Sequence, residues 1–503
     1  MKKLNFAIAI LILILVMSSF AGGIVGQTNV GLTKIHLTLL ELAKQSPNQL
    51  IEVIVQKNGD AASVETQVAQ LGGVVTQDLS IIHAFAAKLP AKAAATLAQS
   101  PEVRWISPDA TVSKSADPLE ITSTANLANA YIKEIGADKL WMRGIQGQNV
   151  RVAVIDSGVN PQNDLYTIMG RNRIVDAVAF NDDYNKSVFD GYGHGNHIAG
   201  IIGGGGAFSN DKYVGVAPMS DIVNVKVSND DGGARVSNVI AGMAWVLFNK
   251  TRLNIRVVNI SLNTDVVESY HTSPLAAASE VLWFNKIVVV ASAGNKQDGK
   301  LYAPANDPFI ITVGAVDDKG TSSTTDDVLT NFSSYGTAEG VSKPDLVAPG
   351  KNIISLRGGF DSVLSRTYPD RVINERYFRM SGTSMSAAVV AGAVALLLQD
   401  EPNLTPDQVK YRLMATANKN ISGYSSTKAG AGLINVQAAV DGTSTQNANT
   451  GKVVSRLISG SNTTTYNSVS WNSVSWNSVS WNSVSWNSVS WNSVSWNSTY
   501  WGN

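Results

Sequence analysis

Between residues 125 and 439 the chain carries short runs of consecutive apolar, β-branched residues instead of an alternation of apolar and polar ones. Strands of this kind are apolar on both faces, which is typical of a parallel sheet covered by helices on either side. Helix-like stretches separate the runs, as in a series of βαβ units. The pattern predicts strands at 150–155, 222–227, 255–260, 287–290 and 309–313, and helices at 237–250, 274–285 and 385–398. We therefore expect an α/β fold with a doubly wound, mostly parallel sheet.

Residues 49–112 follow a different pattern. Strand-like runs at 50–55 and 84–89 combine with Ala-rich, helix-like stretches at 62–71 and 91–98, a mixture that predicts a small α+β domain. Residues 109–124 are rich in Ser, Thr, Ala and Asp and have little periodicity, so we expect a linker there.

The N-terminal segment has the order of a secretory signal. Lys2 and Lys3 precede an apolar run at 6–16, and small residues follow at 18, 19 and 21–23. This order predicts a cleaved signal peptide over 1–27. The alternative is an uncleaved membrane anchor, because no charged residue lies between Lys3 and Lys34. Either interpretation predicts export of the rest of the chain.

The C-terminal segment, 467–503, is repetitive. It consists of five-residue units, mostly Asn-Ser-Val-Ser-Trp, and contains seven of the eleven Trp residues. A period of five aligns the Trp residues on neither a strand nor a helix, which favours a loose, uncharged tail. The alternative is a multivalent aromatic surface that contacts carbohydrate or the cell envelope. Residues 442–466 are predicted to link this tail to the preceding domain.

Composition excludes several classes of function. Lys and Arg total 39 and Asp and Glu total 39, so the formal net charge is zero, which argues against nucleic acid as a partner. A hydrophobic content of 44% excludes a disordered chain. The sequence has no Cys, which excludes a disulfide framework, a thiol nucleophile and a thiolate zinc site.

Chemically competent residues follow the predicted strands or open the predicted helices. Asp156 ends the first strand of the sheet, and Asn295 comes shortly after the strand at 287–290. His194 and Ser384 each precede an apolar, helix-like stretch. Ligands of open parallel sheets bind outside the carboxyl ends of the strands, so these side chains are expected at one edge of the sheet.

An acid, a histidine and a serine at a helix start are the parts of a nucleophilic triad. A serine hydroxyl is a poor nucleophile unless an imidazole removes its proton, and the imidazole needs a carboxylate to fix its tautomer. Each motif also has a plainer interpretation. Asp156 could form a turn or bind magnesium, His194 and His197 could bind a metal or pack in a helix, and 203–206 could be a phosphate loop or a flexible turn.

The order Asp156, His194, Ser384 separates these alternatives. Asp156-Ser157-Gly158, Gly193-His194-Gly195-Asn196-His197 and Gly382-Thr383-Ser384-Met385 resemble the subtilase (subtilisin-like) family of serine endopeptidases. The segments 214–218, 259–262, 293–295 and 343–350 match further family motifs. The resemblance implies a subtilisin-like catalytic domain over 116–441. It also implies that 28–115 is a ferredoxin-like propeptide, which acts as inhibitor and folding chaperone of the enzyme.

The resemblance implies a role for each matching residue. Ser384 would attack the peptide carbonyl, His194 would carry the proton, and Asp156 would orient His194. The side-chain amide of Asn295 and the backbone N–H of Ser384 would bind the oxyanion. Substrate binding would fall to the backbone at Asp231, Gly232 and Gly233, and to the pocket walls formed by Ser261, Leu262, Asn263, Ser292, Ala293 and Gly294.

The resemblance also sets the expected cofactors, partners and location. The chemistry needs no cofactor. Many relatives carry structural calcium, but the sequence does not indicate ligands for it here. Asn263 stands where the family has Gly, and Ser386-Ala387-Ala388-Val389 replaces the family's usual residues after the nucleophile. The sequence thus predicts a secreted endopeptidase of broad, apolar-leaning specificity that acts on proteins or peptides. The alternative is a catalytically inactive, exported binding protein that presents the Trp repeats.

Overall fold

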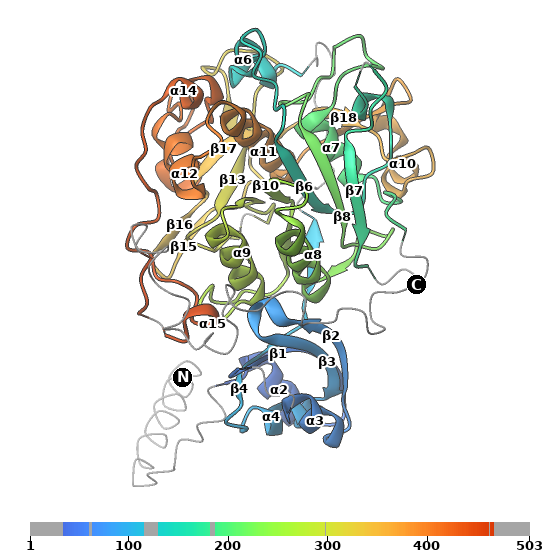
Figure 1. Cartoon of the computed structure of the whole chain (residues 1–503), viewed down its shortest axis with the longest axis vertical. Coiled ribbons are helices and arrows are strands. Elements are labelled where there is room, and N and C mark those ends of the chain that lie inside the picture. The colour runs from blue at the N-terminus through green and yellow to red at the C-terminus, as the bar shows by residue number, and fades with distance from the viewer. Residues whose placement is uncertain are drawn as a thin grey trace, which may run out of the picture.

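The computed structural model describes residues 34–59, 63–114, 129–167, 169–181, 187–296, 298–461 and 463–466. The predicted signal peptide at 1–27 and the repeats at 467–503 lie outside these residues. The described chain forms a large domain and a smaller N-terminal domain that packs against one side of it (Figure 1).

The large domain is built on one sheet in the order β14-β13-β12-β10-β6-β8-β7, with β17 also paired to β13. The described pairs are parallel except β13 with β14. The strands are β6 (Arg151–Asp156), β7 (Ile174–Ala179), β8 (Asp221–Lys226), β10 (Ile255–Ile260), β12 (Val288–Ser292), β13 (Ile311–Asp317), β14 (Val328–Leu329) and β17 (Leu346–Pro349). The prediction of a mostly parallel sheet is confirmed.

Helices cover both faces of this sheet. On one face α8 (Val236–Asn249) and α9 (Pro274–Phe284) pack side by side, and on the other α7 (His194–Gly203) packs with α11 (Thr383–Asp400) (Figure 1). The remaining helices and strands of the domain are shorter or peripheral: α5 (Tyr131–Glu134), α6 (Ala137–Trp141), α10 (Val363–Thr367), α12 (Pro406–Ala415), α13 (Ser426–Ala429), α14 (Val436–Asp441), β15 (Gly336–Ala338), β16 (Val341–Lys343), β18 (Ile353–Leu356), β19 (Val372–Ile373) and β20 (Tyr377–Met380).

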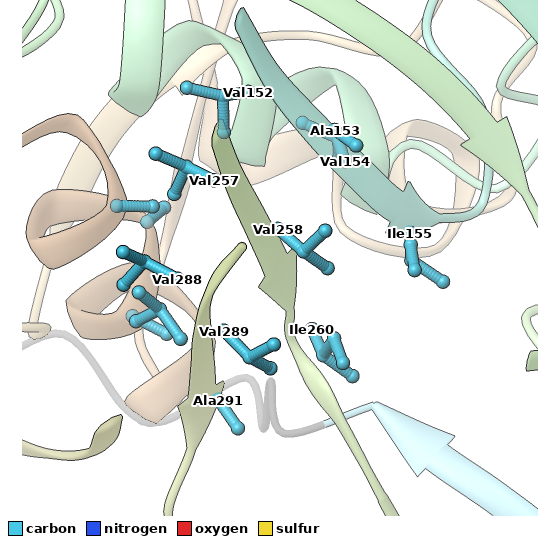
Figure 2. Close-up of a cluster of buried hydrophobic side chains, with 14 of the residues drawn as sticks. Val152, Ala153, Val154, Ile155, Val257, Val258, Ile260, Val288, Val289 and Ala291 are labelled. Atoms are coloured by element: carbon cyan, nitrogen blue, oxygen red, sulfur yellow. The ribbon is translucent and has the colours of Figure 1, made fainter. Parts of the chain in front are cut away.

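The core lies between the central strands and the helices on either face. Figure 2 shows the side chains of Val257 and Val288 among those projecting from β6, β10 and β12 into this core. The helix α11 is long and apolar enough to cross a membrane, but 89% of it is buried within the described protein. It is therefore a core helix, which explains why its sequence is apolar all round.

The N-terminal domain is an antiparallel sheet in the order β2-β3-β1-β4. Its elements are α2 (Leu37–Gln45), β1 (Leu50–Lys57), α3 (Ser63–Gln70), β2 (Val74–Leu79), β3 (Ala84–Pro90), α4 (Ala91–Leu97) and β4 (Val103–Pro108). The βαββαβ order is ferredoxin-like. Along β1, Val53 and Val55 pack in the domain's own core, whereas Ile54 belongs to the apolar cluster shared with the large domain. Both faces of this sheet are thus covered.

Residues 443–461 and 463–466, here called the C-terminal strap, follow α14. The sequence predicted a linker over 442–466. In the structure the strap packs along the large domain and forms the short helix α15 (Arg456–Ser459), and its Val454 and Leu457 are buried. In Figure 1 the strap descends from α14 to α15, beside the N-terminal domain.

Candidate active site

Asp156 and His194 form a buried, hydrogen-bonded pair. Asp156 ends β6 and is 1% exposed, and His194 begins α7 and is fully buried. The Nδ1 atom of His194 lies 2.8 Å from Oδ1 and 2.9 Å from Oδ2 of Asp156. A carboxylate at Nδ1 holds the proton there and leaves Nε2 as a proton acceptor. Among the described residues, Nε2 of His194 has no hydrogen-bond partner.

The loop that carries His194 is held close to the end of β6. A Cβ atom on Gly195 would lie 2.1 Å from the carbonyl oxygen of Gly158, so only glycine allows this approach. The N–H of Gly195 donates to Oγ of Ser157 at 2.9 Å. Asp190 holds the same loop, because it accepts hydrogen bonds from the N–H of Gly193 at 2.7 Å and from Oγ of Ser157 at 2.8 Å. Sequence reasoning missed Asp190, whose only signal is its position directly before the Gly-rich segment.

Ser384 lies in the first turn of α11 and is fully buried. Its hydroxyl donates to the carbonyl oxygen of Ser261 at 3.2 Å, and Oγ of Ser261 donates to the carbonyl of Ser384 at 3.1 Å. Among the described residues no hydrogen bond joins Oγ of Ser384 to Nε2 of His194. Such bonds are commonly loose in unliganded enzymes and tighten when substrate binds.

Asn295 lies next to the serine helix. Its Oδ1 accepts hydrogen bonds from the N–H of Thr383 at 3.1 Å and from Oγ1 of Thr383 at 3.0 Å. These two bonds fix the orientation of the amide. Its Nδ2 is buried and has no partner among the described residues. A buried donor without a partner is costly, and it is suited to a group that acquires negative charge during a reaction.

An extended strand lies beside these residues. β5 (Thr111–Lys114) pairs antiparallel with β11 (Leu262–Thr264) on one side and with β9 (Ala234–Arg235) on the other. Val112, opposite both Thr264 and Ala234, is 3% exposed. Of the predicted substrate-binding residues, Leu262 and Asn263 pair with β5.

The segment Asp231-Gly232-Gly233 forms a turn immediately before β9, where Oδ1 of Asp231 accepts the N–H of Gly233 at 2.8 Å. The residues that pair with β5 are instead Ala234 and Arg235. The sequence did not indicate them, because a two-residue strand has no periodicity.

The two predicted pocket walls face each other. Ser261-Leu262-Asn263 follows β10, and Ser292-Ala293-Gly294 ends and follows β12, which is the parallel neighbour of β10. Nδ2 of Asn263 donates to the carbonyl of Ser292 at 3.1 Å, and Oγ of Ser292 donates to Oδ1 of Asn263 at 3.3 Å. The Asn263 side chain thus joins the two predicted pocket walls through hydrogen bonds.

His197 does not join the site. Its Nε2 lies 3.2 Å from the carbonyl of Ile353 and 3.0 Å from that of Phe378, and burial lowers its pKa to about 3. It is a neutral, packed residue. Within the ranges that the structure describes, no group of three or more His, Cys, Asp or Glu side chains is arranged to hold a metal ion. Calcium ligands therefore stay unassigned.

Three acidic side chains with raised pKa values, Glu134, Asp318 and Asp327, lie elsewhere in the large domain. Burial, with repulsion from neighbouring carboxylates, raises the pKa of Glu134 to about 11 and that of Asp318 to about 7. Burial also raises the pKa of Asp327 to about 6. Glu134 is therefore protonated in the folded protein at neutral pH, which bears on stability and not on the active site.

Comparison with known proteins agrees with this geometry. The model of the subtilase family matches residues 147–433. The chain belongs to the subtilase family. It is a serine-type endopeptidase of the subtilisin kind, and the family resemblance predicted from the sequence is confirmed.

Named relatives are serine proteases and subtilisins. Serine protease AprX from Bacillus subtilis (strain 168) is 37% identical over 308 residues, which cover 59% of this chain and 67% of AprX. Subtilisin NAT from Bacillus subtilis subsp. natto is 31% identical over 385 residues, which cover 75% of this chain and 86% of the relative. Fervidolysin from Fervidobacterium pennivorans, a keratinolytic enzyme related to subtilisin, has a TM-score of 0.60 and 24% identity. That match covers 79% of this chain and 62% of fervidolysin, and it concerns the fold.

Proposed function

We propose that this subtilase is an exported endopeptidase that works through Asp156, His194 and Ser384, with Asn295 as oxyanion donor. The buried Asp156–His194 pair carries the proposal. Among the described residues, Nε2 of His194 has no partner, and it lies at the edge of the sheet where Ser384 lies. Two hydrogen bonds support the arrangement. Ser384 is bonded to the carbonyl of Ser261, which follows β10, and Asn295 is bonded to the N–H of Thr383, which begins α11.

Catalysis begins when the Ser384 hydroxyl turns from the Ser261 carbonyl to Nε2 of His194. His194 takes the proton as Oγ attacks the peptide carbonyl, and Asp156 stabilises the resulting imidazolium. The carbonyl oxygen becomes an oxyanion, which binds Nδ2 of Asn295 and the N–H of Ser384. That N–H lies in the first turn of α11, where backbone N–H groups have no partner within the helix. His194 then gives its proton to the leaving amine, and water hydrolyses the acyl-enzyme by the same steps.

The N-terminal domain is an inhibitory propeptide in this proposal. Its C-terminal strand β5 occupies the groove between β9 and β11, as an extended substrate would. Lys114, opposite Leu262, is the last described residue of β5, and Leu262 directly follows Ser261, the partner of Ser384. The precursor is therefore cut within a residue or two of Lys114, near the predicted end of the propeptide at 115. Cleavage leaves the domain bound as a product-like inhibitor.

Specificity is broad and apolar-leaning at the position that Val112 occupies, because Val112 is buried in the large domain's apolar cluster. Specificity for the residue directly before the cleaved bond depends on the space between the two pocket walls. The Asn263 bridge to Ser292 narrows it and adds polar atoms, which favours a small or polar residue directly before the cleaved bond.

Export of the enzyme rests on the predicted signal at 1–27 and on the relatives that are named subtilisins. The repeats at 467–503 are interpreted as a loose tail, with a cell-envelope or carbohydrate contact as the alternative. Deleting 467–503 tests that contact, since unchanged retention on cell-envelope material would contradict it.

Intact mass spectrometry of the secreted wild type beside Ser384→Ala tests the enzymatic proposal. The wild type is expected to lose the mass of 28–115 and to cleave casein, while Ser384→Ala retains this mass and loses about 10⁶-fold in turnover. Equal masses together with absent casein cleavage in the wild type would favour the inactive binding protein. Casein cleavage by Ser384→Ala at the wild-type rate would refute the triad.

A further inference from the structure

The C-terminal strap lies outside the part of the chain that the subtilase family accounts for. The family match ends at residue 433, and the strap begins ten residues later. Its contacts therefore need an explanation that the catalytic fold does not provide.

The strap is fixed to the large domain by buried polar contacts. Nδ2 of Asn449 donates to Oδ1 of Asp407 at 2.6 Å. The N–H of Ser455 lies 3.1 Å and 3.0 Å from the two carboxylate oxygens of Glu280, a buried residue of α9. The Tyr466 ring stacks on Phe284 with centroids 5.5 Å apart. Residues on either side of α15 are thus anchored, so α15 has a defined position.

The opposite side of α15 faces the N-terminal domain. The carbonyl oxygen of Leu457 accepts two hydrogen bonds from that domain, from Nε2 of Gln56 at 3.2 Å and from Nη1 of Arg104 at 2.9 Å. The Arg456 guanidinium lies over the Trp105 ring, 4.7 Å from its centroid. Gln56 is 2% exposed.

These contacts come from two neighbouring strands of the N-terminal domain. Gln56 is in β1, and Arg104 and Trp105 are in β4, its antiparallel neighbour. The contacts with the strap are separate from those of β5, which pairs only with β9 and β11 among the described strands. The strap therefore holds the N-terminal domain in addition to β5 and to the apolar sheet face that packs against the large domain.

We propose that the strap is a dedicated docking surface for the N-terminal domain. The partner bound by the strap is this domain, because their groups are complementary. The Leu457 carbonyl accepts two hydrogen bonds from the domain, and the Arg456 cation lies over an aromatic ring of the domain. The strap follows the catalytic domain in sequence, so cleavage near Lys114 leaves it in the mature enzyme. It then slows release of the cleaved domain, a consequence that rests on the proposed role of this domain as an inhibitory propeptide.

Hydrogen exchange in the uncleaved, full-length Ser384→Ala protein tests docking directly. The backbone amides of β1 and β4 are measured in this background and with Arg456→Ala, Trp105→Leu or both changes. Loss of the cation–π contact is expected to speed exchange about two- to tenfold. The double change is expected to speed it no more than the stronger single change, since both remove one contact. Arg143→Ala is the matched control, because Arg143 pairs with Asp441 near α6, away from the N-terminal domain.

The proposal would be overturned if Arg456→Ala left the exchange rates of β1 and β4 unchanged. It would also be overturned if the double variant increased these rates by the product of the two single effects. Activity provides a second readout in the chain with its native Ser384. Arg456→Ala is expected to reach half of its final activity about two- to tenfold sooner after processing, with the same final kcat/KM as wild type. If no variant processes itself, the inhibitory-propeptide proposal fails, whereas the exchange data still decide whether the strap binds the domain.

Discussion

Replacing Asn295 by Asp separates the hydrogen bonds that its side chain accepts from its proposed role as oxyanion donor. The carboxylate keeps an oxygen for the N–H and hydroxyl of Thr383, which Oδ1 of Asn295 accepts at 3.1 and 3.0 Å. It removes the Nδ2 donor, which is buried and without a partner among the described residues. The variant therefore preserves the local hydrogen bonds of α11 while it removes the group proposed to bind the oxyanion.

The expected loss of kcat in Asn295→Asp is that of one of two oxyanion donors. Removal of one such donor costs about 10²–10³-fold in kcat, a magnitude established on subtilisin itself, which corresponds to about 2.7–4 kcal/mol of transition-state stabilisation. The backbone N–H of Ser384 remains, so activity should stay measurable. The negative charge of Asp next to a forming oxyanion adds to the loss, which places Asn295→Asp at or above the upper end of this range.

The assay is steady-state hydrolysis of a peptide chromogenic substrate, with active sites counted by a covalent serine reagent. We expect kcat to fall with KM changed by about twofold or less, because the contact forms in the transition state and not with bound substrate. Thr383→Val is the control, since it removes one contact to Oδ1 and leaves Nδ2 in place. If Asn295→Asp retained more than about a tenth of wild-type kcat, the assignment of the oxyanion donor would be wrong.

Three further predictions concern other residues. Asp190→Asn should lower kcat about tenfold with little change in KM, because it disturbs the hydrogen bonds that position the His194 loop, and kinetics at saturating substrate will check this. Asn263→Gly should raise kcat/KM about tenfold for Phe relative to Ser directly before the cleaved bond, as a paired peptide series can show. Glu134 is protonated when folded and ionised when unfolded, so wild-type stability should fall as pH rises from about 5 towards 9. Glu134→Gln removes this term, and urea unfolding in the Ser384→Ala background should show its advantage growing with pH by at most about 1.4 kcal/mol per unit, unlike the exposed control Glu375→Gln.

The central sheet was predictable because each of its strands carries its own signal. Runs of Val and Ile that are buried on both faces mark β6, β8 and β10 within a residue of their observed bounds. The same runs point to the sheet edge where Asp156 lies, so the order of chemical residues along the chain was informative. Asn263 was noticed only as a departure from a family pattern, and its bridge to Ser292 needed coordinates.

Elements whose stability comes from distant partners could not be predicted. β9 has two residues and exists because β5 lies beside it, more than a hundred positions away in the sequence. The strap has a polar composition typical of a linker, yet the N–H of Ser455 reaches a carboxylate on α9 and Leu457 is buried between two domains. Asp190 was missed for the same reason, since its importance lies in three backbone and side-chain partners that the pattern does not reveal.

The burial of α11 has a consequence for how the enzyme is inactivated by heat. Ser384 sits in the first turn of a helix whose residues from Thr383 to Leu398 are all buried, and which packs against β10, β12 and β13. Ser384, the proposed nucleophile, cannot leave its position by fraying of a surface element, because that helix moves only when the core opens. Heat inactivation and global melting should therefore coincide, and an enzyme that still has its fold should still have its activity.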